Sequence, residues 1–371
     1  MRIGYVIWSL ELGGAEQVVM RLAAGMKARG HEVAIFTLNA PGVYAPEMEA
    51  QGIPVVPMHK QGAYDIAVIG RLAKAIRQRR CDVVHTHLWG AGLWGRLAAR
   101  LAGVPVILAH EHGMQPWRGT GHFLADRLLM SVTDRVLFAS EQVREDYLAR
   151  TGAKSGRCLV LPNGVECAPW TETRAEVRAA LGWAPQERIV LSVGRLSPEK
   201  GYVDLLQAFT IVSRRLPGVR LVLVGDGEQA DALRGLGAQL GLNSQIVFAG
   251  RRTDVRRWLA GADVYVQPSR REGLPLAVLE AMAAGLPVVV TRVGDLEQLT
   301  REGTLGRLVS AERPQELAEA LIGVLEHVDA QRPMTEAARA MVEKFYSFGR
   351  MVQTVEDLYQ EQLRYHAPPP R

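Results

Sequence analysis

Short β-rich runs alternate with helical patterns along most of the chain, and this alternation is the feature that most limits its fold. Runs of strand character lie at residues 2–8, 82–87 and 104–110. The intervening segment 14–30 instead carries apolar residues at helical spacing. Alternation of this kind predicts a parallel sheet with helices on both faces.

The pattern begins again after residues 162–170, a segment rich in turn-forming residues that we interpret as a hinge. We therefore predict an α/β protein of two doubly wound, Rossmann-like domains that face each other across a cleft. The expected bounds are 1–165 for the first domain, 166–184 for a linker and 185–344 for the second domain. Ligands of such sheets bind at the carboxyl ends of the strands, so the cleft is the expected site.

The composition excludes several classes of protein. Hydrophobic residues make up 48% of the chain and charged residues 22%, which is an ordinary globular balance. No apolar run has the length of a membrane span, and the N-terminal residues lack the pattern of a secretion signal. The few cysteines have no CxxC spacing, which favours a reducing cytoplasm over a disulfide framework.

The net charge of +5 lies in the first 170 residues. This charge suggests either a solvated helix face or attraction to an anionic membrane or a phosphate-bearing substrate. Nucleic acid is disfavoured as a partner, because no binding module accompanies the basic residues.

The loop at residues 193–201 carries Arg195 and Lys200 between a predicted strand and a predicted helix. Such a junction offers backbone N–H groups and a positive helix end to an anion. Two cations on this loop can bind the two phosphates of a diphosphate. The alternative is that Lys200 forms a surface ion pair.

A second stretch, SRREGLPLAVLEAMAAGLPVVVT at 269–291, places two glutamates around a helix start. Pro275 suits the first helical position, and Gly273 and Leu274 then present N–H groups at the helix start. Glu272 and Glu280 can accept hydrogen bonds from vicinal hydroxyls of a sugar or a ribose. Alternatively, Glu272 caps the helix and Glu280 pairs with an arginine.

Two further loops of the second half follow predicted strands. The sequence VGDGE at 224–228 lacks the third glycine of the dinucleotide-binding fingerprint. The sequence FAGRRTD at 248–254 contains Arg251 and could hold a nucleotide base.

The ordered motifs VGRLSPEKG, LVGDGE, FAGRRTDV, ADVYVQPSRREGLPLAVLEAMAAGLPVVVT and VGDLEQL resemble the retaining, nucleotide-sugar-dependent glycosyltransferases of family 4, which have the GT-B fold. LGGAEQVV near the N-terminus and LPNGV at the hinge match the same family. The resemblance implies that Arg195 and Lys200 neutralise the donor diphosphate. It further implies that Glu272, with the two N–H groups after it, faces the transferred sugar and the phosphate, and that Glu280 binds the ribose.

In the first domain, the resemblance implies that Gly13 and Gly14 form a loop over the donor and acceptor, and that His112 lies near the reacting sugar carbon. It also implies that the final helix, about 345–365, packs on the first domain. Asp295 departs from the family pattern, which more often has glycine there.

The resemblance implies transfer of a sugar to a hydroxyl acceptor with retention, without a cofactor and without a metal. A UDP-sugar is the favoured donor, with GDP-mannose second. The acceptor is a sugar, a growing polysaccharide or a lipid-linked molecule, as in cell-envelope biosynthesis.

Two HxH pairs, His85 with His87 and His110 with His112, support a rival reading as a metal-dependent hydrolase, because residues two apart on a strand share a face. Against it, Glu111 is the obvious nearby carboxylate and should point the opposite way. The alternative to metal binding is that His85, His87 and His110 line the cleft or form hydrogen bonds within the core. Further alternatives are a sugar-nucleotide 2-epimerase of the same fold and a nucleotide-sugar sensor.

Peripheral contact with the inner, anionic face of a membrane is a separate hypothesis. The basic segment 71–80 and the segment 114–130, with Trp117, Phe123 and Leu124, are candidate contacts. Burial of Phe123 and Leu124 in the domain core is the alternative.

Overall fold

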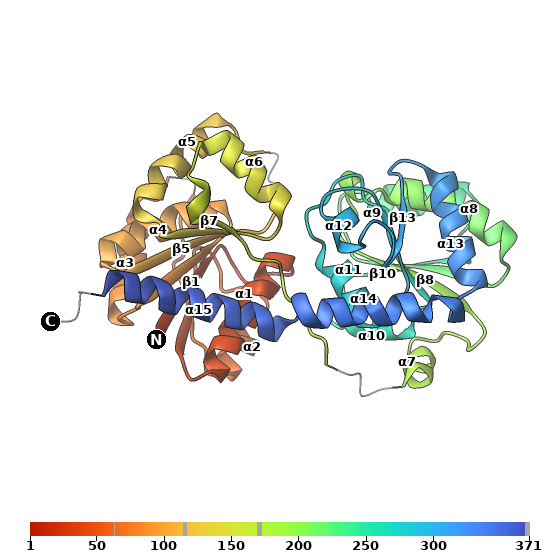
Figure 1. Cartoon of the computed structure of the whole chain (residues 1–371), viewed down its shortest axis with the longest axis horizontal. Helices are drawn as coiled ribbons and strands as arrows, with labels where there is room; N and C mark the ends of the chain where they lie inside the picture. Colours follow the sequence, from red (N-terminus) through yellow and green to blue (C-terminus); the bar gives the residue numbers. More distant parts are fainter. Residues whose placement is uncertain (63, 114–116, 169–172, 368–371) are drawn as a thin grey trace. The chain divides into compact units, whose positions relative to one another are not determined.

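The computed structural model describes residues 1–62, 64–113, 117–168 and 173–367 (Figure 1). It divides into two compact units, each with its own parallel sheet. Unit 1 contains residues 1–164 and the C-terminal segment from Phe348, and unit 2 contains Val165–Ser347. The predicted hinge falls partly outside the description, at residues 169–172.

Unit 1 has a seven-stranded parallel sheet in its described residues, in the order β3-β2-β1-β4-β5-β6-β7. The first six positions follow the Rossmann order, so the direction of winding reverses between β1 and β4. The strands are β1 (Arg2–Ile7), β2 (Glu32–Thr37), β3 (Val55–Pro57), β4 (Val83–His87), β5 (Val106–Glu111), β6 (Arg135–Phe138) and β7 (Cys158–Val160).

Helices connect these strands and cover the sheet of unit 1. They are α1 (Gly14–Ala28), α2 (Ala45–Ala50), α3 (Ala67–Gln78), α4 (Trp89–Ala102), α5 (Thr120–Leu129), α6 (Glu141–Thr151) and α15 (Phe348–His366), with short 3-10 turns at Met130–Val132 and Ser155–Arg157.

Unit 2 repeats the Rossmann order in a six-stranded parallel sheet of its described residues, β10-β9-β8-β11-β12-β13. Its winding reverses between β8 and β11. The strands are β8 (Arg188–Val193), β9 (Val219–Val224), β10 (Ile246–Gly250), β11 (Val264–Gln267), β12 (Val288–Thr291) and β13 (Arg307–Val309).

The helices of unit 2 are α7 (Arg174–Ala180), α8 (Tyr202–Arg215), α9 (Ala230–Gln239), α10 (Val255–Gly261), α11 (Leu276–Ala283), α12 (Leu296–Leu299), α13 (Pro314–Glu326) and α14 (Arg332–Phe345), with 3-10 turns at Pro198–Lys200 and Asp329–Gln331.

The sheet of unit 2 is buried on both faces, as a doubly wound fold requires. Ile189 and Leu191 of β8 contribute to one apolar core, whereas Val190 between them contributes to the other. Alternate residues of a strand point to opposite faces, so a continuous apolar run serves two layers of helices. The predicted fold class of two Rossmann-like domains is therefore confirmed.

Two segments differ from the sequence-based expectation. Strand β3 was not predicted, because its three residues adjoin Pro54 and end at Pro57, and proline disfavours strand assignment. The segment 166–184, expected to be a linker, contains α7. Val177 of α7 and the nearby Trp183 are buried in unit 2.

The final helix α15 packs against α1 in unit 1, where Figure 1 shows it in dark blue. The approach is close, because a Cβ at Gly25 of α1 would lie 2.6 Å from Val352 of α15. Glu356 of α15 accepts hydrogen bonds from Arg29 and His31, each at 2.6 Å. Among the residues described, none of the helices has the length and apolar character that crossing a membrane requires.

Candidate functional site

The carboxyl ends of β8 and β11, where the sheet of unit 2 reverses its winding, are joined by an ion pair. Lys200, at the end of the loop after β8, donates from Nζ to Oε1 of Glu272 in the loop after β11, at 2.5 Å. Gly201 allows the two loops to approach, because a Cβ there would lie 2.0 Å from the carbonyl oxygen of Pro268. Its φ of +68° is also one that glycine adopts without strain. The structure thus brings together two residues that the sequence predicted separately.

Buried polar side chains hold the Glu272 carboxylate in place. Its Oε1 also accepts hydrogen bonds from Ser269 Oγ at 2.8 Å and from Gln267 Nε2 at 2.9 Å. Tyr265 in turn donates to the Gln267 side-chain oxygen at 2.5 Å, which fixes the orientation of that amide. Among the described residues, Glu272 Oε2 makes no hydrogen bond, so it remains available as an acceptor.

Gln267, Ser269 and Tyr265 were not recognised from the sequence as site residues. The available signal was the polar pair Gln267 and Ser269 directly after the strand residues VYV, in VYVQPS at 264–269. Both Gln267 and Ser269 are nearly inaccessible to solvent. Buried polar groups of this kind need partners, and here Glu272 supplies them.

Arg195 lies on the same loop as Lys200 but is much more exposed. Its side chain is 68% exposed and pairs with Glu228 at 3.0 Å. Arg251, after β10, is 62% exposed, and its Nε lies 3.8 Å from Asp226 Oδ2 after β9. Both cations therefore lie at the carboxyl edge of the sheet and can reorient toward an anion.

Helix α11 begins one residue later than predicted. Pro275 is the N-cap rather than the first helical residue, because its ψ of 122° is extended. Leu274 is buried in the apolar core. The loop after β12 closes over this turn, since a Cβ at Gly294 would lie 2.2 Å from the Glu272 carbonyl oxygen.

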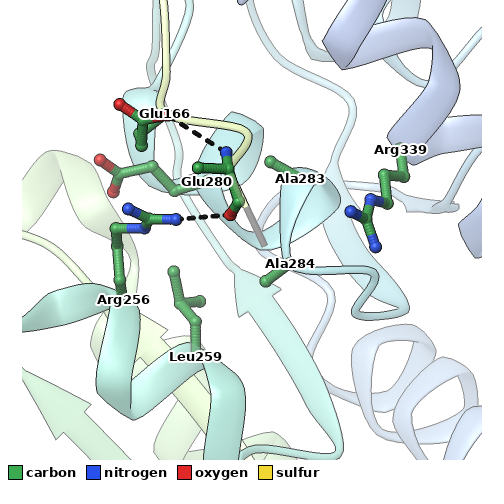
Figure 2. Close-up of a pocket in the computed structure, with 8 residues that line it drawn as sticks. Glu166, Arg256, Leu259, Glu280, Ala283, Ala284 and Arg339 are labelled. Atoms are coloured by element: carbon green, nitrogen blue, oxygen red, sulfur yellow. Dashed lines mark hydrogen bonds between the residues drawn. The ribbon is translucent and has the colours of Figure 1, made fainter. Parts of the chain in front are cut away.

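Glu280 of α11 lines a pocket of about 210 Å³ in unit 2. Figure 2 shows its carboxylate beside that of Glu166 and the guanidinium of Arg256. Arg256 donates to the carbonyl oxygen of Ala168 at 2.8 Å, and the N–H of Ala168 donates to Glu166 at 3.1 Å. Acidic and basic groups thus share this pocket, which suits a polar ligand with hydroxyl groups.

In unit 1, Gly13 is the N-cap of α1, and Gly14 is the first residue of the helix after β1. A Cβ at Gly13 would lie 2.1 Å from the Glu16 carboxylate, so the loop and the first turn are close. Burial raises the pKa of that carboxyl. The loop lies at the carboxyl end of β1, beside the point at which this sheet reverses its winding.

His112 follows β5 and belongs to a cluster of four histidine rings. Its Nε2 lies 2.9 Å from Nδ1 of His87 on β4. Its ring stacks on that of His110, with 4.1 Å between centroids. Burial lowers the pKa of His112 to about 4, although the Asn163 side chain partly offsets this effect. The ring is therefore neutral at pH 7.

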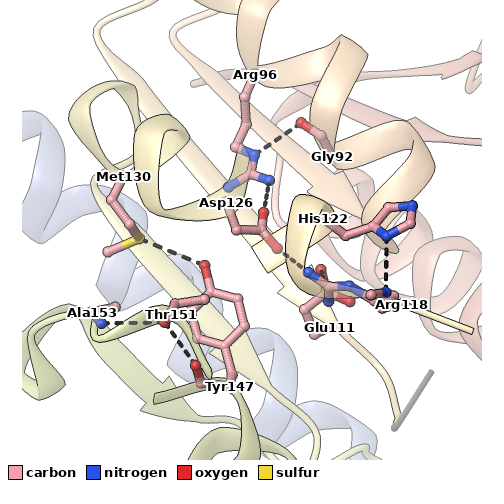
Figure 3. Close-up of polar contacts among 11 residues, drawn as sticks. Gly92, Arg96, Glu111, Arg118, His122, Asp126, Met130, Tyr147, Thr151 and Ala153 are labelled. Carbon is pink, nitrogen blue, oxygen red and sulfur yellow. Dashed lines mark hydrogen bonds and ion pairs between the residues drawn. The ribbon is translucent and has the colours of Figure 1, made fainter. Parts of the chain in front are cut away.

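Glu111 points away from the histidines, as predicted, and joins a separate buried network (Figure 3). Arg118 lies 3.6 Å from Glu111 and also pairs with Asp126, which pairs with Arg96 at 2.5 Å. Burial raises the pKa of Glu111 to about 7, even though Arg118 opposes this shift. The network joins β5, α4 and α5 and contributes no ligand to the histidine cluster.

Helix α5 has an exposed apolar edge. Phe123 is buried, as the core alternative predicted, whereas Leu124 and Leu128 are 58% and 67% exposed. Trp117, just before the helix, is 61% exposed. The start of the predicted contact segment, 114–116, lies outside the described residues. Residues 71–78 of the basic segment 71–80 form the latter part of α3, and Arg71 pairs with Asp65.

Two family models match the chain in succession. The model described as Glycosyltransferase Family 4 matches residues 12–168, and Glycosyl transferases group 1 matches 173–341. A D-inositol 3-phosphate glycosyltransferase of Actinosynnema mirum is 31% identical over 354 residues, covering 84% of this chain and 83% of the relative.

An Escherichia coli relative, named UDP-Gal:alpha-D-GlcNAc-diphosphoundecaprenol alpha-1,3-galactosyltransferase, is 28% identical over 307 residues, covering 80% of this chain and 79% of its own. Among solved structures, Anabaena HepE in complex with UDP superposes with a TM-score of 0.85 at 22% identity, covering 97% of this chain and all of that one. This structural likeness concerns the fold.

Proposed function

Because the chain belongs to the family 4 glycosyltransferases and has the GT-B fold, we propose that it transfers a sugar from a nucleoside diphosphate to a hydroxyl acceptor with retention of configuration. The observation that carries the proposal is the Lys200–Glu272 pair at the reversal point of unit 2. Ligands of doubly wound sheets bind at such points.

Lys200 and Arg195 bind the diphosphate of the donor. The Lys200 ammonium has three N–H donors, and Glu272 uses one, so the others remain for phosphate oxygens. Arg195 exchanges its exposed partner Glu228 for the second phosphate. Backbone N–H groups of Gly273 and Leu274 add donors at the start of α11. These groups stabilise the negative charge that develops on the leaving nucleoside diphosphate.

The reaction forms a bond between the acceptor oxygen and the anomeric carbon as the bond from that carbon to the phosphate oxygen breaks. The departing phosphate takes the proton of the acceptor hydroxyl from the same face, which retains configuration. Glu272 Oε2 accepts a hydrogen bond from a sugar hydroxyl, and the neutral ring of His112 contacts the transferred sugar. In this scheme Lys200 and Arg195 neutralise the diphosphate, so the reaction includes no metal step.

A UDP-sugar is the favoured donor, with GDP-mannose second. The E. coli relative is named for UDP-galactose, and the Anabaena structure contains UDP. Glu280, in the pocket beside Glu166 and Arg256, binds the ribose hydroxyls. Arg251 and its loop hold the base.

The acceptor is a sugar or lipid-linked molecule, in keeping with the diphosphoundecaprenol named for the E. coli relative. The exposed Leu124 and Leu128, with Trp117, are suited to peripheral contact with an anionic membrane at its cytoplasmic face. Flotation with anionic vesicles tests this contact: Leu124→Glu with Leu128→Glu should release the protein, and equal flotation of both forms would exclude this surface.

Donor binding is tested by thermal unfolding of the purified chain with UDP-, GDP- and ADP-sugars, because a ligand of the native state raises its melting temperature. We expect nucleotide sugars with one of these bases to raise the melting temperature of the unmodified chain. The same donor should not raise the melting temperature of Lys200→Ala. Stabilisation that persists in this variant would place the diphosphate elsewhere. Incubation of the stabilising donor without acceptor, with a search for an epimer, separates transfer from 2-epimerisation.

A further inference from the structure

Three histidines of unit 1 converge at the carboxyl ends of two adjacent strands. His85 and His87 lie on one face of β4, and His110 lies opposite His87 in the register of β5. One ring nitrogen of each lies within 4.8 Å of the others. The three side chains are at most 1% exposed. The strands therefore hold three nitrogen ligands together in the interior of the unit.

These rings have nitrogens without hydrogen-bond partners among the described residues. They are Nε2 of His85, Nε2 of His87 and both nitrogens of His110. Buried polar atoms in folded proteins are nearly always satisfied. Several unsatisfied nitrogens within one cluster of rings therefore point to a common ligand.

The Nδ1 atoms of His85 and His87 contact other side chains, which fix the orientation of both rings. Tyr359 of α15 lies with its hydroxyl 2.7 Å from Nδ1 of His85, and His112 contacts Nδ1 of His87 at 2.9 Å. Both contacts leave Nε2 as the ring nitrogen without a hydrogen-bond partner among the described residues. Metal-binding histidines have this arrangement, in which a partner on one nitrogen orients the other toward the ion.

We propose that His85, His87 and His110 form a binding site for a transition-metal ion, of which Zn²⁺ is the best candidate. Imidazole is a preferred ligand of zinc, and three histidines with an open fourth position form a known zinc geometry. In the structure the three nitrogens lie within 4.8 Å of one another. Zinc–nitrogen bonds of about 2.0–2.1 Å require shorter distances between the nitrogens, so the side chains rotate toward one another when the ion binds. The partly exposed His112 marks the route of entry.

The proposed ion is bound by residues of unit 1, whereas the residues assigned to the diphosphate belong to unit 2. The residues assigned to the diphosphate, Lys200 and Arg195, are on the β8 loop. Asp, Glu and Cys are missing from the cluster of possible ligands among the described residues, and Glu111 pairs with Arg118 instead. An all-imidazole site favours zinc, copper or nickel over magnesium or calcium.

The test uses the full chain without a histidine tag, freed of metal by a chelator. Zn²⁺ is titrated in competition with a coloured chelator, and Co²⁺ is added separately to record its visible absorption. We expect one ion per chain and the cobalt bands of nitrogen coordination. His110→Phe, which keeps a ring in the core, should abolish both signals, whereas His327→Phe, in unit 2, should retain them.

Tyr359→Phe provides a second variant that keeps the ring and removes only the hydroxyl. We expect about tenfold weaker zinc binding, the lower end of the range for loss of an orienting partner. A chain that binds no ion, or that binds it equally in His110→Phe and His327→Phe, would overturn the proposal and leave the histidines as core residues. UDP binding measured on the same samples keeps this outcome distinct from failure of the donor site.

Discussion

Lys200 and Glu272 form an ion pair 2.5 Å long between two loops that lie 72 residues apart in the sequence. The Glu272 side chain is only 9% exposed and that of Lys200 is 21% exposed, so the pair is largely removed from water. Removing either partner leaves a buried charge uncompensated, whereas a bound diphosphate adds negative charge on the lysine side. The pair therefore links the two loops, so the arrangement of both loops affects donor binding.

Lys200→Ala should lower kcat/KM by about 10²–10³, the range found when one donor to a developing negative charge is lost. Steady-state assays with the donor identified by thermal shift measure the effect. Arg332→Ala removes an exposed cation from α14 and is the matched control, expected to retain full activity. Turnover of Lys200→Ala within twofold of the unmodified chain would remove this residue from the mechanism.

Arg195 and Glu228 form an exposed pair, which contributes at most about 1 kcal/mol to stability. Arg195→Ala should therefore weaken UDP binding with little change in melting temperature. Glu228→Gln should strengthen UDP binding, because it removes the carboxylate that competes with phosphate. Calorimetric titration with UDP at low and high ionic strength measures the affinity of both variants. The two affinities should become similar at high salt, because salt screens exposed charges. Equal UDP affinity in both at low salt would contradict the assignment.

The sequence was sufficient to predict the strands of both sheets except β3, because buried parallel strands appear as apolar runs between helical patterns. The residue patterns predicted Lys200 and Glu272 separately, and the resemblance to family 4 assigned both to one donor site. The network behind Glu272 could not be predicted. Which polar side chains meet across a turn depends on the packing of the β11 loop, as the bonds from Ser269 and Gln267 illustrate.

In the histidine cluster, too, the sequence predicted the local arrangement but not the contacts with residues distant in the chain. The HxH spacing predicts that His85 and His87 share a face, and the structure confirms this. The contact between Tyr359 and His85 spans 274 residues and depends on the return of α15 to unit 1. Local spacing carries no information about such a partner.

Gly294→Ala should destabilise unit 2 and impair donor binding. The residue has φ of +57°, and an added Cβ would lie 2.2 Å from the backbone oxygen of Glu272, so the turn that positions this carboxylate must shift. Gly285→Ala is the control, because Gly285 has φ of +75° but open space around it. The control should show only the backbone cost of about 1–2 kcal/mol. Thermal unfolding and UDP titration measure both variants, and equal losses would exclude an effect through Glu272.

The attachment of α15 to unit 1 should depend on pH through Glu356. Burial alone would raise the pKa of this carboxyl, but hydrogen bonds from His31 and Arg29 outweigh it and hold the pKa below its ordinary value of 4.5. A carboxyl whose pKa is lower in the folded state stabilises the protein above pH 4.5. This contribution is lost as the pH falls through the folded pKa.

Glu356→Gln should therefore lower the free energy of unfolding by about 1.5–3 kcal/mol at pH 7, the range for hydrogen bonds to charged groups. Urea titrations of both forms at several pH values measure the difference, which should shrink below pH 4.5 as the unmodified carboxyl becomes protonated. Glu361→Gln, on the same helix but 60% exposed, is the control and should change stability little at any pH. A Glu356→Gln deficit that stays constant down to pH 3 would mean that packing of the side chain, rather than its charge, holds α15 against α1.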